Sequence, residues 1–533
     1  MATDLHKTAT KGPTNADLAR ALDIRADELR HEGANVYRIR AYQRAARSVE
    51  SFPQDITGLV AQGADLRHIP DVGPDLAAKL RTLVEGGEGP ASLQRTPPRR
   101  ARGPLKSVPG RKPTDERRIR PLVLDAAAAI RRALADAPGI ARAEGVGSLR
   151  RLSDTVGDLD FLIAGPLDAA RKALDGHPEV DGIVADKGNV LTVRLTNGLH
   201  VDVRSATPQA FGAAWMLTTG TPKHNEDLAR HTKTKGFRLR DDGLFKGRKR
   251  VDCSTEDEVY AHLHLQSIPP ELREGTGEVE AAAKGKLPEL VTLADLTGDL
   301  HTHTVDSDGA DTLEAMARAA LKRGLSYIAV TDHTSRTSIA HGMKWPGFQR
   351  QAKLIAKLND AFADEGTDFR ILRGAEVDIL KDGSLDLAPK ELEQLDVVVA
   401  SLHFRERQTG KEHTQRVLKA MGTGKAHILG HPSGRMLGRR PAMDLHWPRL
   451  LDAAKDQGWA FEVDGSPWRQ DVWGELVRLG KETGIRFALD SDAHATHELG
   501  YQAHALDQAR RGWLEADDVL NTRTVKQLLK MLT

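Results

Sequence analysis

Apolar residues recur along this chain with three different spacings, and each spacing predicts a different kind of structure. In the first 90 residues, Leu18, Leu22, Ile24 and Leu29 recur near helical spacing, and residues 37–49 continue the pattern with basic residues interleaved. We therefore expect an all-α N-terminal block.

The middle block shows the alternation of half-buried strands. Two apolar sets flank a turn: Leu191, Val193 and Leu195 before it, and Leu199, Val201 and Val203 after it. A three-residue loop, 196–198, with Gly198 left-handed would place the two sets directly opposite each other. This register sends Asp202 to the opposite face of the sheet.

From about residue 295, predicted strands alternate with helices, and nearly every strand ends in an acid or an imidazole. The strand sequences are DLHTHT, YIAVTDH, ILRGAEVDI, VVVASLH, HILGH, FEVDG and FALDSDAH. Functional groups at the C-terminal ends of successive parallel strands are what a barrel active site requires. We expect seven βα units here.

Length and composition indicate a modular globular protein. With 533 residues the chain is too long for one core, and about three domains of ~150–200 residues are expected. No apolar run approaches the ~18 residues of a membrane span, and Met1 to Pro13 lacks the features of a signal peptide. A single cysteine, Cys253, excludes an internal disulfide framework and favours the cytoplasm.

Two polar segments divide the chain. Residues 95–120 hold ten Lys/Arg, five prolines and only Asp115 and Glu116 as acids, so this segment is either a basic linker that lies along phosphates or a solvated tether. A second connector runs from Pro269 to Lys286. The predicted domains are 1–90 (helical), 91–118 (basic linker), 119–270 (an α+β block divided into two parts, palm and thumb), 271–294 (linker) and 295–533 (barrel).

Residues 68–83, HIPDVGPDLAAKLRTL, resemble a helix-hairpin-helix, whose turn presents backbone N–H groups to a DNA phosphate. The match is partial, because Asp71 stands at the usual first glycine and only Gly73 is kept. A plain helical hairpin is the alternative.

The segment 146–165 predicts a carboxylate metal site. Asp158 and Asp160 alternate along a predicted strand, so both project from one face, where hard cations such as magnesium bind between protein and phosphates. Asp202 on the adjacent strand completes a set that can bind two metals, one activating a 3′-hydroxyl and one supporting a leaving pyrophosphate. Four neighbours suit the substrate: Gly147, Ser148 and Gly157 allow close backbone approach, and Arg151 can pair with a phosphate. Acids that merely decorate an exposed strand would not account for these four residues.

These motifs, GSLRR with GDLD, resemble the family X DNA polymerases of the nucleotidyltransferase superfamily, and residues 211–245 resemble their thumb. The family carries an N-terminal DNA-binding and deoxyribose-phosphate lyase domain, which residues 1–90 resemble. Lys79 stands where the family places its Schiff-base lysine, although an ordinary exposed helix lysine is the alternative. A lysine amine is a nucleophile only if its pKa is depressed.

Departures from the family concern its grip on DNA and nucleotide. Leu217 and Thr218 replace the aromatic pair that contacts the incoming sugar, and Ala229 replaces an arginine that holds the template, whereas Asn225 is kept. A second DNA-binding hairpin is missing between residues 90 and 120. We expect preserved metal chemistry with a weakened polymerase.

The third block carries nine candidate metal ligands: His301, His303, Asp308, His333, Glu376, His403, His431, Asp492 and His494. Mixed imidazole and carboxylate ligands suit zinc, manganese or iron better than calcium, and ions in such a site activate water for attack on phosphorus. The block looks like a PHP (polymerase and histidinol phosphatase) domain, which implies a distorted (βα)7 barrel and up to three metals. Four arginines on loops after the ligand-bearing strands are candidates for holding substrate phosphates: Arg435, Arg439, Arg440 and Arg469.

Over essentially its full length the chain resembles the bacterial family X polymerases with a C-terminal PHP domain. The resemblance implies gap filling and a manganese-dependent 3′-5′ exonuclease, with Mg²⁺ or Mn²⁺ at the carboxylates and two to three Mn²⁺, Zn²⁺ or Fe²⁺ in the barrel. It also implies gapped or 3′-ended duplex DNA and deoxynucleoside triphosphates as partners. We expect a cytoplasmic, nucleoid-associated monomer that does not bind membranes.

Three alternatives stay open from sequence. The polymerase module could be a degenerate DNA-binding adaptor for the nuclease, or the barrel could be a small-molecule phosphatase of the histidinol-phosphate type. The retained Asp158, Asp160 and Asp202 argue against the phosphatase, which needs no second two-metal site. A pure DNA-binding scaffold would not need nine ligands.

Overall fold

The computed structural model describes residues 13–31, 36–50, 52, 54–86, 117–337, 340–404 and 408–532. The chain divides into two compact units, residues 1–103 with 308–310 and residues 104–307 with 311–533. Almost all of the predicted basic linker 91–118 lies outside the described residues. None of the described helices is long and apolar enough to cross a membrane.

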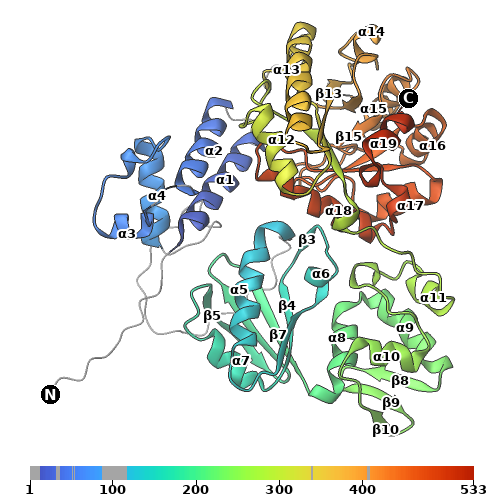
Figure 1. Ribbon diagram of the computed structural model, residues 1–533. Helices are drawn as coiled ribbons and strands as arrows, with labels where there is room; N and C mark the ends of the chain where they lie inside the picture. The colour runs from blue at the N-terminus through green and yellow to red at the C-terminus, as the bar shows by residue number, and fades with distance from the viewer. Residues whose placement is uncertain are drawn as a thin grey trace. The chain divides into compact units, whose positions relative to one another are not determined.

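The N-terminal unit is helical, as predicted. Its elements are α1 (Asn15–His31), α2 (Val36–Glu50), α3 (Ile56–Ala61), the 3-10 helix η1 (Leu66–His68) and α4 (Pro74–Gly86). Leu18, Leu22 and Leu29, which recur near helical spacing, are buried with Tyr42 and Leu80 in one apolar core. Figure 1 shows these helices in blue.

The turn before α4 keeps its shape without its usual glycine. Asp71 takes a φ of +60°, the left-handed conformation that favours glycine. Its carboxylate accepts hydrogen bonds from Arg44 Nε (3.1 Å) and Ser48 Oγ (3.3 Å), which hold the turn against α2. Open space surrounds the position of a Cβ on Gly73, so the backbone there can be approached closely.

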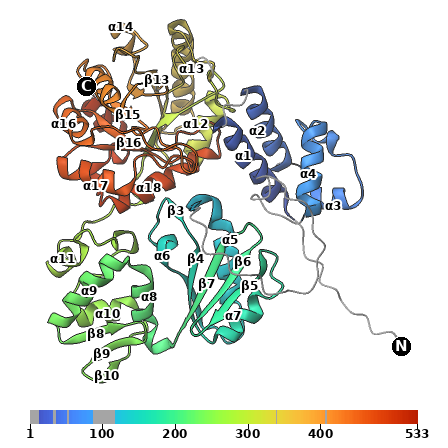
Figure 2. The same cartoon turned by 180° about the vertical axis from the view of Figure 1, so that it is seen from behind.

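The palm is a five-stranded sheet with strand order β2-β4-β7-β6-β5. Its elements are η3 (Arg120–Val123), α5 (Leu124–Ala135), β2 (Arg142–Gly145), α6 (Gly147–Arg150), β4 (Leu159–Ala164), α7 (Leu167–Leu174), β5 (Val180–Lys187), β6 (Val190–Leu195) and β7 (His200–Ala206); β1 (Arg118–Ile119) pairs with β3 (Thr155–Val156) beside it. Helices α5 and α7 cover one face, as the two opposite views show (Figure 1, Figure 2). Phe161, Val201 and Val203 pack with Ile130 on that face, so the alternate residues of β4 and β7 lie on the other.

The predicted hairpin register is confirmed. Leu191 pairs with Val203 and Val193 with Val201, and Gly198 has a φ of +84°. Asp202 pairs with Thr192 and therefore lies on the face opposite the apolar set.

The thumb follows the palm. It contains η4 (Pro208–Ala210), α8 (Phe211–Thr219), α9 (Pro222–Thr234), β8 (Phe237–Arg240), β9 (Gly243–Lys246), β10 (Lys249–Val251) and α10 (Glu256–Leu263). The three strands form a small antiparallel sheet of order β10-β9-β8.

The predicted connector 271–294 holds more structure than its polar sequence suggests. It contains the end of η5 (Pro270–Leu272), α11 (Glu278–Ala283) and η6 (Leu293–Asp295). Leu272, Val279 and Leu290 pack into the thumb core, and buried Glu278 lies 2.5 Å from His224 Nδ1. Acidic residues that the sequence suggests are exposed to solvent are thus partners of buried basic side chains. Much of this segment packs as part of the thumb.

The C-terminal block is the predicted seven-stranded parallel barrel, with strands in sequential order from β11 to β17. The strands are β11 (Gly298–Thr302), β12 (Tyr327–Val330), β13 (Arg370–Asp378), β14 (Val397–Ser401), β15 (Ile428–Gly430), β16 (Ala460–Asp464) and β17 (Phe487–Asp490). A bridge between Thr302 and Ala493 brings the last strand end back to the first, and a register shift in β11 distorts the closure.

Helices surround the barrel strands (Figure 1). They are α12 (Leu313–Lys322), α13 (Trp345–Asp364), α14 (Pro389–Leu392), α15 (Gly410–Met421), α16 (Trp447–Gln457), α17 (Gly474–Thr483), η8 (Glu498–Tyr501), α18 (Gln502–Arg511), η9 (Ala516–Asp518), η10 (Leu520–Thr522) and α19 (Val525–Leu532).

Candidate metal centres

The palm brings its three predicted carboxylates together. Asp160 on β4 lies directly opposite Asp202 on the parallel strand β7, and Asp158 immediately precedes β4. One carboxylate oxygen from each residue lies within 4.8 Å of the other two. Thr192 Oγ donates to Asp202 at 2.6 Å and fixes its orientation. This geometry suits divalent cations with oxygen ligands.

The backbone beside this set requires glycine. Gly147 has a φ of +61°, and a Cβ there would lie 2.5 Å from Asp160 Oδ2. Ser148 follows in the short helix α6, and its carbonyl accepts from Ser153 N at 3.1 Å. Gly157 lies before the strand, with Arg117 as the nearest group that a Cβ would meet. The predicted roles of these residues toward a nucleotide stay predictions.

The paired arginines of GSLRR differ in their contacts. Arg151, the predicted phosphate ligand, donates to Glu274 (3.1 Å) and to the Thr219 carbonyl (2.7 Å). Arg150 forms two 2.7 Å hydrogen bonds to Glu256, with its guanidinium 3.6 Å from the Trp215 ring centre. Arg150 thus connects palm to thumb, which two adjacent arginines in a sequence do not reveal.

Asn225, the residue kept from the family motif, lies on α9 of the thumb. Its Nδ2 donates to the Leu217 carbonyl at 2.8 Å. Its Oδ1 is buried and has no hydrogen-bond partner among the described residues, so this side chain has an acceptor to offer. Leu217 and Thr218 lie at the end of α8, and Ala229 lies within α9.

Clustering the three acids costs free energy. Burial and the negative charges of Asp158 and Asp202 raise the pKa of Asp160 to about 7. Burial and Asp202 also raise the pKa of Asp158. A nearby cation would relieve both effects, since it stabilises the ionised carboxylates.

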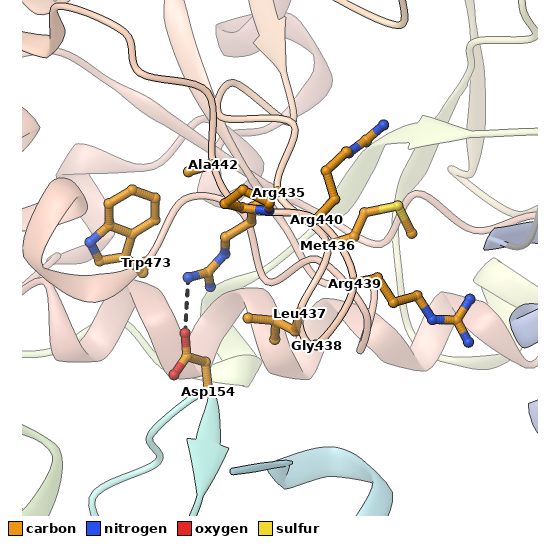
Figure 3. Close-up of a pocket in the computed structure, with 10 residues that line it drawn as sticks. Asp154, Arg435, Met436, Leu437, Gly438, Arg439, Arg440, Ala442 and Trp473 are labelled. Atoms are coloured by element: carbon orange, nitrogen blue, oxygen red, sulfur yellow. Dashed lines mark ion pairs between the residues drawn. The ribbon is translucent and has the colours of Figure 1, made fainter. Parts of the chain in front are cut away.

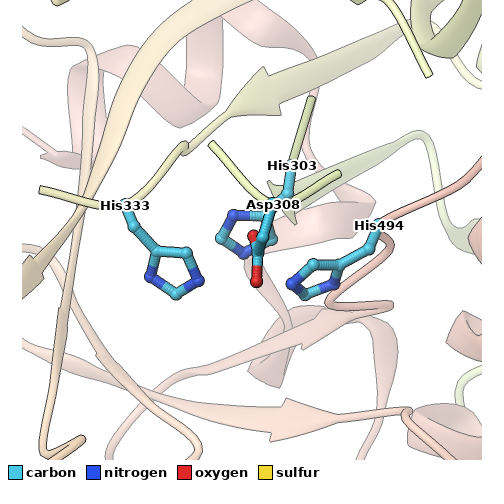
Figure 4. A group of neighbouring side chains, drawn as sticks. All are labelled: His303, Asp308, His333 and His494. Carbon is cyan, nitrogen blue, oxygen red and sulfur yellow. The ribbon is translucent and has the colours of Figure 1, made fainter. Parts of the chain in front are cut away.

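The barrel brings eight of the nine candidate ligands to the carboxyl-end region of its strands, and the ninth, Asp308, lies in the loop after β11. Three groups of close ligand atoms form: His303, Asp308, His333 and His494; His301, His303 and Asp492; and His333, Glu376 and His403. Figure 4 shows the first group, with the three imidazoles around Asp308. His431, which is outside these groups, places Nε2 2.9 Å from Glu376 Oε1.

Glu376 lies at the centre of this cluster. Its Oε2 is 2.7 Å from His333 Nδ1, and its Oε1 is 3.0 Å from His403 Nε2. Burial would raise the pKa of Glu376, but the neighbouring His403, His333 and His301 hold it well below its ordinary value. The carboxylate is therefore ionised, as a metal ligand must be.

Two carboxylates behind the cluster orient its imidazoles, and sequence reasoning did not identify their role. Glu462 Oε1 lies 2.6 Å from His301 Nδ1, and Asp378 Oδ1 lies 2.9 Å from His403 Nδ1. Each leaves the Nε2 atom of its imidazole directed to the cluster, the usual support of a metal-binding histidine. Both stand two residues from another acid on the same strand, a spacing that could have found them.

The residues present fit metal ions. His301 Nε2 and both ring nitrogens of His303 are buried without a hydrogen-bond partner among the described residues. Burial and the neighbouring imidazoles of His494 and His333 lower the pKa of His303 to about 3, so its ring is neutral and can ligate. Buried nitrogens of this kind are costly unless a ligand occupies them.

The four predicted phosphate-binding arginines lie on two barrel loops. Arg469 is next to the cluster, with Nε 3.3 Å from Asp464 and 3.8 Å from Asp492. Arg435 pairs with Asp154 of the palm at 2.9 Å, while Arg439 and Arg440 follow on the same loop. Arg469 is thus a direct neighbour of a candidate metal ligand, Asp492.

Lys79 lies on α4 of the N-terminal unit, where it donates to Asp75 (2.7 Å) and to the Tyr42 hydroxyl. Burial lowers the pKa of Lys79, but these two hydrogen bonds outweigh it and the net shift is upward. The amine is therefore protonated at neutral pH, which opposes nucleophilic attack.

Three family models match the chain: the Helix-hairpin-helix domain over residues 13–89, the DNA polymerase beta thumb over 214–274 and the PHP domain over 299–464. DNA polymerase/3′-5′ exonuclease PolX of Bacillus subtilis (strain 168) is 34% identical over 387 residues, 72% of this chain and 67% of that protein. Probable phosphatases of Thermoanaerobacter sp. (strain X514) and Vibrio parahaemolyticus are each 32% identical, over 44% and 45% of this chain and 94% of their own length. The predicted family resemblance is confirmed, and the phosphatases match less than half of the chain.

The raised pKa of Asp160 predicts a metal-dependent stability effect. The folded pKa of about 7 exceeds the ordinary 3.8, so without metal the folded state loses stability as pH rises from about 4 to 7. The full difference between the two pKa values corresponds to a loss of at most about 4 kcal/mol in the free energy of unfolding. Asp160→Asn should therefore raise the thermal unfolding midpoint of the metal-free protein, and more at pH 8 than at pH 5. Asp452→Asn, which changes an exposed residue, is the control. An increase in the unfolding midpoint of Asp160→Asn that is equal at the two pH values, or larger at pH 5, would contradict this assignment.

The protonated amine of Lys79 predicts that Schiff-base chemistry is absent at neutral pH. Borohydride added to wild-type protein with abasic-site DNA at pH 7.5 should trap no more covalent product than it does with Lys79→Ala. If the wild type gave a trapped covalent product and Lys79→Ala did not, Lys79 would be the nucleophile and this prediction would be wrong.

Proposed function

The chain belongs to the family of DNA polymerase/3′-5′ exonuclease PolX, and we propose that it extends and shortens DNA 3′ ends at two separate metal sites. The observation that carries the proposal is the presence of two complete ligand sets on different folds within one chain. Asp158, Asp160 and Asp202 converge on the palm, and nine ligands converge on the barrel. The barrel alone would serve a phosphatase, but the palm set has no use in one.

The metals expected are Mg²⁺ or Mn²⁺ at the palm and two to three Mn²⁺, Zn²⁺ or Fe²⁺ in the barrel; when bound, they stabilise the charge that develops on phosphorus and activate the attacking oxygen. In the palm, Asp160 has to give up its proton to ligate, and Thr192 holds Asp202 in register. Arg151 and Asn225 are proposed to meet the incoming nucleotide. The partners are gapped or 3′-ended DNA and deoxynucleoside triphosphates, and we expect a monomer.

In the barrel, protein groups set the direction and protonation of each ligand. Glu462 and Asp378 hold the Nδ1 atoms of His301 and His403, so both rings present Nε2 to the cluster. Arg469 places a cation beside Asp492, where we propose that it binds a non-bridging oxygen of the scissile phosphate. The remaining arginines and Gly73 of the N-terminal turn are proposed DNA contacts.

A second candidate is a nuclease whose polymerase module only binds DNA. Leu217, Thr218 and Ala229 favour it, because they stand where the family places residues that contact sugar and template. A labelled primer on a gapped duplex, incubated with manganese or magnesium and with or without nucleotides, distinguishes shortening from extension.

The two sites should be chemically separable. His303→Ala or Asp492→Ala should reduce primer shortening by at least about 100-fold, because each removes a ligand from the buried cluster, and should leave extension within about twofold. Asp160→Ala should have the reverse effect. Exposed Asp452→Ala on α16 is the matched control, and shortening that survives both barrel substitutions would show that the barrel is not the nuclease.

The polymerase should discriminate weakly between ribo- and deoxyribonucleotides. Leu217 and Thr218 offer the sugar no aromatic wall, so a 2′-hydroxyl meets no steric penalty there. Gap filling should also be slow, since small misplacements of the reacting groups cost ~100-fold in rate.

Single-turnover insertion of matched ribo- and deoxyribonucleotides into a one-nucleotide gap measures both properties. Fast insertion with strong preference for the deoxyribonucleotide would show that other residues supply the contacts. No insertion even in manganese would favour the DNA-binding adaptor.

A further inference from the structure

A cavity of about 540 Å³ lies between the loop after β15 and Asp154 of the palm (Figure 3). The loop residues 435–442 form most of its lining, Trp473 forms one side, and Asp154 of the palm completes it. None of these residues belongs to the nine candidate ligands.

The lining is held in place by backbone hydrogen bonds. Met436 and Arg440 exchange two N–H···O bonds of 2.8 Å, and Leu437 N donates to the Trp468 carbonyl at 2.8 Å. The loop is therefore fastened to the segment that follows β16.

The same loops connect the cavity to the candidate nuclease site. The loop begins immediately after His431, and Arg435 Nε donates to the Arg469 carbonyl at 2.8 Å. Arg469 in turn reaches Asp492 with its Nε at 3.8 Å. One residue thus separates the cavity wall from a candidate metal ligand.

The wall combines apolar side chains with positive charge. Met436, Leu437 and Trp473 supply the apolar part. The Arg435 guanidinium lies 5.0 Å from the Trp473 ring centre and is paired with Asp154, and the Arg439 guanidinium lies 4.6 Å from the Trp468 ring centre. In Figure 3 the Arg439 and Arg440 side chains extend away from Trp473, so cations lie beyond the apolar wall.

We propose that this cavity is a subsite for one unpaired nucleotide of the DNA strand cut in the barrel, on the 5′ side of the scissile phosphate. This inference rests on the proposed nuclease function. An aromatic base can stack on the apolar wall while Arg439 and Arg440 meet the strand's phosphates, the combination by which proteins hold single strands. The cavity volume of about 540 Å³ is in the range of small-ligand sites, so one nucleotide is a suitable occupant.

The subsite predicts that strand length controls binding. A strand too short to reach the cavity gains nothing from it, whereas a longer strand adds base stacking and phosphate contacts. For wild-type enzyme in manganese, KM for shortening of oligothymidylates should fall by about tenfold or more between the dinucleotide and the octanucleotide.

Leu437→Glu places a negative charge on the wall and should raise the octanucleotide KM toward the dinucleotide value, with kcat within about twofold. Arg439→Glu should raise the same KM and weaken the salt dependence of binding. Matched controls are Leu479→Glu and Arg449→Glu, which change exposed residues on α17 and α16. Hydrolysis of bis(4-nitrophenyl) phosphate, which is too short to reach the cavity, should stay within about twofold in Leu437→Glu.

Three outcomes overturn the subsite: an unchanged KM in both cavity variants, an equal loss with the controls, or an equal loss on the small diester, which would indicate damage to the metal site. Absence of any shortening by the wild type would refute the proposed nuclease instead. In that case fluorescence anisotropy of a labelled octathymidylate still tests the cavity, because Leu437→Glu and Arg439→Glu should each weaken binding by about tenfold. Unchanged anisotropy would then overturn the subsite as well.

Discussion

The buried carboxylate of Glu376 is the constraint on which the barrel site depends. Its two oxygens lie within 3.0 Å of nitrogens of His333, His403 and His431, which come from three different strand ends. Rings from separate βα units can meet at this distance only if the strands are in register and the barrel is nearly closed. The Thr302–Ala493 bridge and the buried acids behind the imidazoles serve this convergence, since they fix where each strand ends and how each ring is turned.

In the palm the ligands repel one another, whereas in the barrel Glu376 and the imidazoles attract one another. The palm cluster consists of carboxylates alone, and burial together with their mutual repulsion raises the pKa of Asp160. Gly147 lets the backbone approach within a distance that a Cβ would forbid, which keeps Asp160 in the crowded position. Without cations, the negative charges of the palm site are therefore not compensated. The barrel site combines imidazoles with carboxylates, so its net charge is closer to zero even without metal.

How much the sequence predicts depends on whether the deciding contact is local. The hairpin register followed from a period of two and one turn glycine, so Asp202 could be placed on the functional face without a structure. Most barrel ligands were found because they lie near or just after a strand end, and Asp308 follows the first of these strands by six residues. The roles of Glu462 and Asp378 were missed because the histidines they contact lie on or after other strands. The packing of residues 271–294 was missed because Glu278 contacts His224, which is 54 positions away in the sequence.

The sequence also could not show that Arg150 and Arg151 have different partners. These partners show how the palm, the thumb and the barrel all contact the segment after Gly147. Glu274 accepts from Arg151 at 3.1 Å and from Arg511 of α18 at 2.8 Å, and Arg511 donates to the Arg151 carbonyl at 2.9 Å. Trp513 adds an apolar contact with the thumb core. The segment after Gly147 is therefore held by charges from the barrel as well as by its own sheet. Because a partly buried ion pair loses much of its value once one partner is removed, the palm of this chain depends on the barrel for the position of that segment.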